Sequence, residues 1–173
     1  MVFNFGIDGY QPQWLTGVTA LAAAHGERLG RLAGRRLDRV WLLWDLDDDA
    51  WFADGPVLLD FEGEQVEINH QKFDDLSITW NTVDPARPVD WPTDDDIRLA
   101  WRHDTSPEIA ALPGQTLRVV ELLEWTGADV ANGMVAVGFT FADGQLTIYN
   151  ALDENGLAFN PPEPDYRRHP LVG

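Results

Sequence analysis

The sequence predicts a mainly β fold with some α-helix (α+β), in which two four-strand antiparallel meanders form a barrel or a sandwich around a pseudo-twofold axis. Three observations favour this class. A sequence pattern recurs at an offset of 80 residues, short apolar segments alternate with turns that contain glycine, and 45% of the residues are hydrophobic, with eight tryptophans among them. A chain of this composition can bury enough apolar surface to fold.

The recurring pattern divides the chain into two copies. Three blocks of one copy align in order with three blocks of the other: 32–43 with 112–123, 57–68 with 137–148, and 74–81 with 153–160. The first pair shares the pattern L-x-G-x-x-L-x-x-V-x-L-L, and the third pair follows after the loss of one residue. We therefore expect a single domain over residues 1–173, with internal repeats 32–81 and 112–160 joined by an irregular linker, 82–111.

Each copy is expected to contribute four strands. Alternation and β-rich composition predict strands at 37–45, 56–62, 64–70 and 77–81, and in the second copy at the counterpart of 37–45 and at 135–141, 145–150 and 157–160. Glu62-Gly63 and Asp143-Gly144 are expected to form hairpin turns, because Gly and Asp tolerate positive φ. The predicted core comprises Leu42, Phe61, Ile68, Leu122, Phe141 and Ile148.

The segments outside the repeats are expected to add smaller elements. Pro12–Ala24 is predicted to be a helix, because proline suits a first helical turn and Trp14, Val18 and Leu21 form an apolar stripe. A further strand is expected at 97–103, and a short helix at 106–111 capped by Ser106. The proline-rich tail, 161–173, is expected to be extended at the surface.

Charge is the strongest compositional signal for function. The formal net charge is −17 and the sequence pI is about 4.3. Such a surface repels nucleic acid and anionic lipid and attracts a basic protein, so we expect a basic protein partner and no nucleic-acid or membrane partner. The N-terminal segment lacks the basic and apolar regions of a signal peptide, and we expect a cytoplasmic protein.

Two acidic runs with neighbouring tryptophans form the leading candidate site. The runs are Asp47, Asp48 and Asp49, and Asp94, Asp95 and Asp96, with Trp51 and Trp91 beside them. An exposed tryptophan next to carboxylates could anchor an arginine-rich partner. This pattern favours an acidic protein-binding module, most concretely an immunity- or antitoxin-type inhibitor of a basic protein. Solvated loops and packing of the tryptophans onto the core would produce the same sequence.

A second hypothesis is a small-ligand-binding protein or a hydrolase with a site between the repeats. Asp74 and Asp75 occupy a loop equivalent to that of Asp153 and Glu154, and His70 lies nearby in sequence. Facing carboxylates could perform acid–base chemistry, although each aspartate could equally serve its own turn. A structural subunit without a ligand is a third hypothesis.

The residue types argue against a cofactor or a catalytic motif. The chain has no cysteine, its four histidines are scattered, and neither a glycine-rich phosphate loop nor a G-x-S-x-G motif is present. We therefore expect no metal site, no cofactor and no enzyme activity.

Overall fold

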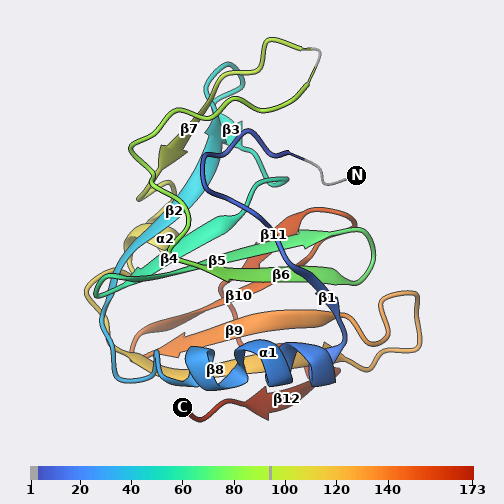
Figure 1. Ribbon diagram of the computed structural model, residues 1–173. Helices are drawn as coiled ribbons and strands as arrows, with labels where there is room; N and C mark the ends of the chain where they lie inside the picture. The colour runs from blue at the N-terminus through green and yellow to red at the C-terminus, as the bar shows by residue number, and fades with distance from the viewer. Residues whose placement is uncertain (1–3, 94) are drawn as a thin grey trace.

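The computed structural model describes residues 4–93 and 95–173, which form two antiparallel sheets that pack face to face (Figure 1). The first sheet contains β1 (Trp14–Thr16), β2 (Leu37–Asp45), β3 (Ala50–Trp51), β4 (Val57–Phe61), β5 (Glu64–Gln71), β6 (Asp75–Trp80) and β7 (Leu99–Arg102). The second contains β8 (Leu117–Trp125), β9 (Val135–Phe141), β10 (Gly144–Asn150), β11 (Asn155–Ala158) and β12 (Tyr166–Pro170). The helices are α1 (Val18–Gly30) and α2 (Pro107–Ala110). The predicted β-rich class is confirmed.

The two sheets arrange their central strands in the same sequence order. The first sheet runs β1-β6-β5-β4-β2-β3, with β7 also paired to β2, and the second runs β11-β10-β9-β8-β12. The pairing of β2 with β4 shifts register between Leu37 and Arg39, and the pairing of β8 with β9 shifts in the same way between Leu117 and Val119. The strands of the described residues form two separate sheets and no closed barrel.

Reciprocal backbone contacts join the starts of β2 and β8. The N–H of Gly34 donates to the carbonyl of Leu117, and the N–H of Gly114 donates to the carbonyl of Leu37, both at 2.8 Å. Both glycines have φ near +90°, which a side chain rarely tolerates. The glycine of the recurring pattern thus allows the backbone just before β2 and just before β8 to turn and to hydrogen-bond to the other sheet.

The main core lies between the inner faces of the sheets. All six residues of the predicted core are buried there: Leu42, Phe61, Ile68, Leu122, Phe141 and Ile148. The Phe61 ring stacks near Phe139 and Phe141, with centroid separations of 5.9 and 6.5 Å. Burial of such rings from both sheets supplies the main force that holds the sheets together.

A second apolar cluster covers the outer face of the first sheet. Leu43 and Leu58 point outward from this sheet and pack under two crossing segments. The segments 4–13 and 82–93 supply Phe5, Ile7, Tyr10 and Val83, and β7 of the same sheet supplies Leu99 and Trp101. The predicted strand at 97–103 is observed as β7, and Ser106 caps α2 by accepting a hydrogen bond from the Ile109 N–H.

The N-terminal helix was predicted too early in the chain. Trp14–Thr16 is strand β1, which pairs with β6, and the helix runs from Val18 to Gly30 instead. Gly26 and Gly30 lie inside the helix because the C-terminal residues pack there: a Cβ on Gly30 would lie 2.4 Å from the Gly173 nitrogen. In the tail, Tyr166–Pro170 forms β12 on the edge of β8.

Candidate functional site

Both acidic runs lie at one end of the molecule. The first occupies the turn between β2 and β3, and the second precedes β7. Antiparallel pairing of β2 with β7 brings them together, since Asp45 pairs with Leu99 and the Leu46 N–H donates to the Arg98 carbonyl at 2.9 Å. We call the described members of this surface the acidic tip: Asp45, Asp47, Asp48, Asp49, Asp95 and Asp96. Asp94 lies outside the described residues.

Two arginines partly neutralise the acidic tip. Arg98 contacts Asp47 at 2.6 Å, and Arg102 contacts Asp49 at 3.2 Å. Hydrogen bonding to the Arg98 guanidinium holds the pKa of Asp47 below its usual value. Six carboxylates thus face two guanidinium groups, and the tip keeps a net negative charge. Because its ion pairs are exposed, they contribute little to stability.

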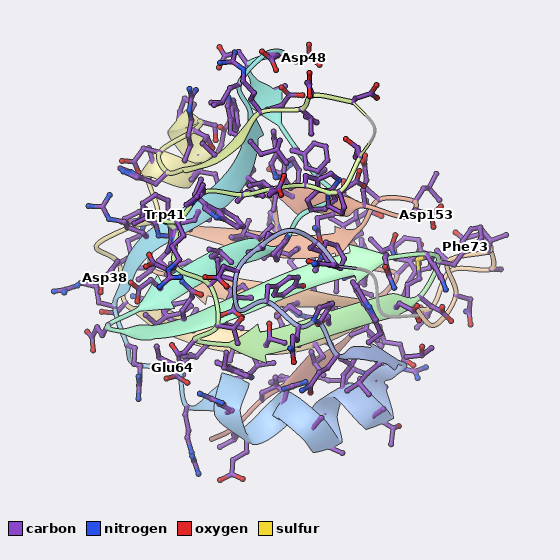
Figure 2. All side chains as sticks on the ribbon, turned by 45° about the horizontal axis from the view of Figure 1, so that its top comes forward. Asp38, Trp41, Asp48, Glu64, Phe73 and Asp153 are labelled. Carbon is purple, nitrogen blue, oxygen red and sulfur yellow. The ribbon has the colours of Figure 1, made fainter. Side chains whose placement is uncertain are left out.

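Three carboxylates of the tip point into solvent without an ion pair in the described part of the chain. They are Asp48, Asp95 and Asp96, and all three are exposed. Figure 2 shows Asp48 at the extreme end of the molecule, away from the packed sheets. These side chains are free to meet a cation from outside.

The two tryptophans beside the runs are half-buried. Trp91 packs edge-on against Phe5 and Phe52, with ring centroids 5.4 and 4.8 Å away. Trp51 pairs with Trp44 across the β2–β3 ladder and contacts the main core. Both rings therefore support the base of the acidic tip, and their role as partner anchors stays a prediction.

The loops of the second hypothesis do lie beside each other. The Asn150 side chain donates to the Lys72 carbonyl at 2.5 Å and so links the β5–β6 turn to the β10–β11 turn. Figure 2 shows Phe73 and Asp153 on the same side of the molecule, away from Asp48. Asp74, Asp153 and Glu154 are exposed, and Asp75 accepts a hydrogen bond from the Thr16 hydroxyl at 3.1 Å.

His70 is closed off from solvent. Its backbone N–H donates to Asn155 Oδ1 at 2.8 Å, and its ring nitrogens lie 3.1 Å from that oxygen and from the Val135 carbonyl. Full burial lowers its pKa to about 4. The Asn155 amide donates in turn to Ala53, Gly55 and Asn69. This hydrogen-bond network joins the two sheets, and the His70 ring has a structural role in it.

Sequence reasoning missed a cleft of about 420 Å³ on the outer side of the second sheet. Trp125 at the end of β8, Tyr149 on β10 and Tyr166 at the start of β12 line it. The loop 126–134 and the segment 159–165 supply its other walls, including Asp129 and Glu163. The aromatic residues are far apart in sequence, and the alternation that places Tyr149 outward was the only available signal.

No protein-family model, curated protein or solved structure matches this chain. Within residues 4–93 and 95–173, no three His, Asp or Glu side chains are grouped so as to hold a metal ion. None of the helices in the described part of the chain is both long enough and apolar enough to cross a bilayer.

Proposed function

We propose that the protein is an acidic protein-binding module, an immunity- or antitoxin-type inhibitor that meets a basic partner protein with its acidic tip. The observation behind this is the juxtaposition of two acidic runs that are more than forty residues apart in sequence. A net charge of −17 adds a long-range field of the same sign. Together they suit the capture of a basic surface.

The tip has the layout expected for electrostatic recognition. Its free carboxylates, Asp48, Asp95 and Asp96, are exposed and give the attraction, while Asp47 and Asp49 of the β2–β3 turn form exposed ion pairs with Arg98 and Arg102. Attraction between exposed charges speeds encounter and selects partners by sign. If the partner acts through a basic cleft, the carboxylates of the acidic tip would fill that cleft and block it.

We include in the proposal that the two four-strand units arose by duplication. Equal strand order, the matching irregularities near Leu37 and Leu117, and the reciprocal Gly34 and Gly114 hydrogen bonds support it. The second unit has an equivalent strand, since β12 pairs with β8 as β7 pairs with β2, but its neighbouring segments 126–134 and 161–165 contain no run of consecutive acidic residues, so the acidic tip belongs only to the first unit. Partner binding would then be a feature that one copy acquired.

The test is a pull-down from the native host with mass spectrometry, followed by binding kinetics on the recovered protein. The variant Asp48→Asn/Asp95→Asn/Asp96→Asn removes the unpaired charges and leaves both ion pairs intact. We expect its association rate to fall by about tenfold or more at low salt, with a smaller change in dissociation. The difference should shrink above physiological salt, where the Debye length is below about 8 Å.

The matched control is Asp74→Asn/Asp153→Asn/Glu154→Gln, which removes the same charge from exposed positions in the β5–β6 and β10–β11 turns. We expect this control to bind nearly as fast as the parent protein. If both variants associated equally slowly, the effect would come from the net charge of the protein and not from the acidic tip. A partner that ignores the tip variant and salt would contradict the proposal.

A further inference from the structure

The cleft on the outer side of the second sheet is a second candidate site, and it does not depend on the proposed function. Its walls are fixed by backbone hydrogen bonds. The Gly133 N–H donates to the Trp125 carbonyl at 2.8 Å, and the Thr126 N–H donates to the Asp165 carbonyl at 3.0 Å. These contacts tie both crossing segments to the end of β8, so the cleft exists before any ligand arrives.

Two of the cleft's rings lie against glycines. A Cβ on Gly156 would come within 2.4 Å of the Tyr149 ring, and one on Gly127 within 2.5 Å of Trp125. Gly156 faces Tyr149 directly across the β10–β11 ladder. Each ring therefore rests on bare backbone on one side, and both rings remain lining residues of the cleft.

A third ring completes an aromatic cluster. Tyr166 lies edge-to-face with Trp125, with a centroid separation of 5.0 Å and an interplanar angle of 74°. Burial and the nearby Glu163 and Tyr149 raise the pKa of Tyr166 to about 12, so its hydroxyl stays protonated at neutral pH. The cluster thus presents uncharged, electron-rich rings together with a carboxylate.

The charges around these rings have one sign. The lining includes the acidic residues Asp129 and Glu163 and, within the described residues, no Lys, Arg or His. The Trp125 indole N–H donates to both oxygens of Asp129, at 3.0 and 3.1 Å. Negative charge at the rim of an indole adds to the attraction of its face for a cation.

The hydrogen bonds of Asp129 favour a cation that needs no N–H acceptor from it. Asp129 already accepts from Trp125 and from the Ala131 N–H at 2.9 Å, so it has little capacity left for the paired N–H groups of a guanidinium. A cation without N–H groups needs no such partner. It gains from aromatic faces and from carboxylates at a distance.

We propose that this cleft binds an alkylated ammonium group, held among Trp125, Tyr149 and Tyr166 and balanced by Asp129 and Glu163. Such a group occurs on small molecules and on methylated lysine side chains, and the chemistry of recognition is the same for both. The volume of the cleft exceeds that of the cationic head and leaves room for the rest of either ligand.

The experiment compares choline with its uncharged isostere 3,3-dimethyl-1-butanol. Titrations are followed by calorimetry and by the Trp125 indole resonance in nitrogen-15 spectra. We expect choline to bind with a dissociation constant on the order of 1 mM or below, and the isostere to bind about tenfold more weakly or not at all. A second arm uses a short peptide with one trimethyllysine. Tighter binding of choline would indicate a free ligand, and tighter binding of the peptide would indicate a protein side chain.

Variants separate the cation site from general packing. Glu163 is exposed and has no ion pair within the described residues, so Glu163→Gln should leave the fold intact and weaken choline binding about threefold. Tyr149→Phe should retain binding and Tyr149→Leu should lose it. The Asp48→Asn/Asp95→Asn/Asp96→Asn variant should bind choline like the parent protein. Equal binding of choline and its isostere, or no binding of choline and peptide at 20-fold the expected constant, would overturn the proposal.

Discussion

The outer face of the first sheet is buried under chain segments, whereas the outer face of the second sheet contains an open cleft. At the 80-residue offset, Leu58 of the first sheet corresponds to Gly138 of the second, and Asn69 corresponds to Tyr149. Leu58 is fully buried by the crossing segments, while Tyr149 lines the cleft. The two sheets thus share a strand arrangement but differ in whether chain segments cover their outer faces. We expect binding sites at the uncovered cleft of the second sheet and at the acidic tip of the first.

The inner faces provide the reference for that comparison. There both sheets use large apolar residues at corresponding positions, such as Phe61 and Phe141, which stack on each other. Inner positions face the same core and are held to the same packing density. Outer positions have no such common requirement, so the sequences of the two sheets diverge there.

The largest expected effect comes from the inner faces. Phe61→Ala and Phe141→Ala should each lower the free energy of unfolding by about 3–5 kcal/mol, because each leaves a cavity in the main core. Urea titration measures both. Since the rings touch, the double variant should lose less than the sum of the two. A loss below about 1 kcal/mol at either position would show that the inner faces are not equivalent.

A smaller effect should come from His70, which joins the sheets. Its pKa is about 4 in the folded protein and near 6.5 when unfolded, so the folded state resists protonation. The contribution to stability is complete above pH 6.5 and is lost as the pH falls from about 6.5 to about 4. The loss should amount to about 3 kcal/mol.

Urea midpoints measured across this pH range check the His70 prediction. The His70→Gln variant cannot titrate, and its midpoint should depend less steeply on pH between 6.5 and 4 than that of the parent protein. The slopes are compared rather than the absolute stabilities, because the substitution also changes the network around Asn155. Equal slopes would assign the pH dependence to other groups.

The sequence predicted the parts of the fold that depend on local pattern. Composition, alternation and turn signals located β2, β4, β5, β9 and β10 within one residue of their observed bounds, and capping chemistry located α2. The helix start was missed because pairing of Trp14–Thr16 with β6 overrides a helical stripe. Helical Gly26 and Gly30 were missed because a distant tail packs on them.

The candidate sites were less predictable for the same reason. Both acidic runs were visible, but their meeting depends on the pairing of β2 with β7, which local pattern does not specify. Trp91 was singled out beside acids, and the structure packs its ring against Phe5, which is distant in the sequence. The cleft draws on β8, β10 and β12, and no motif links Trp125, Tyr149 and Tyr166.

The smallest effect on stability should come from Gly156→Ser, which gives the second sheet the residue that the first has at Ser77. The backbone at Gly156 suits other residues, since its φ is not in the left-handed region. The three atoms nearest to the added Cβ all belong to the Tyr149 ring, a side chain that can swing outward into the cleft. We expect unfolding free energy to change by less than about 1 kcal/mol.

Choline binding should respond far more strongly than stability to this substitution, because the displaced ring would occupy the cleft. Titration of the Gly156→Ser variant by calorimetry, beside its urea midpoint, measures both quantities. Glycine at position 156 would then be explained by the cleft and not by the strand. The corresponding residue of the first sheet, Ser77, shows that the strand can hold a side chain there. A large loss of stability with choline binding retained would assign Gly156 to packing and remove this distinction between the two outer faces.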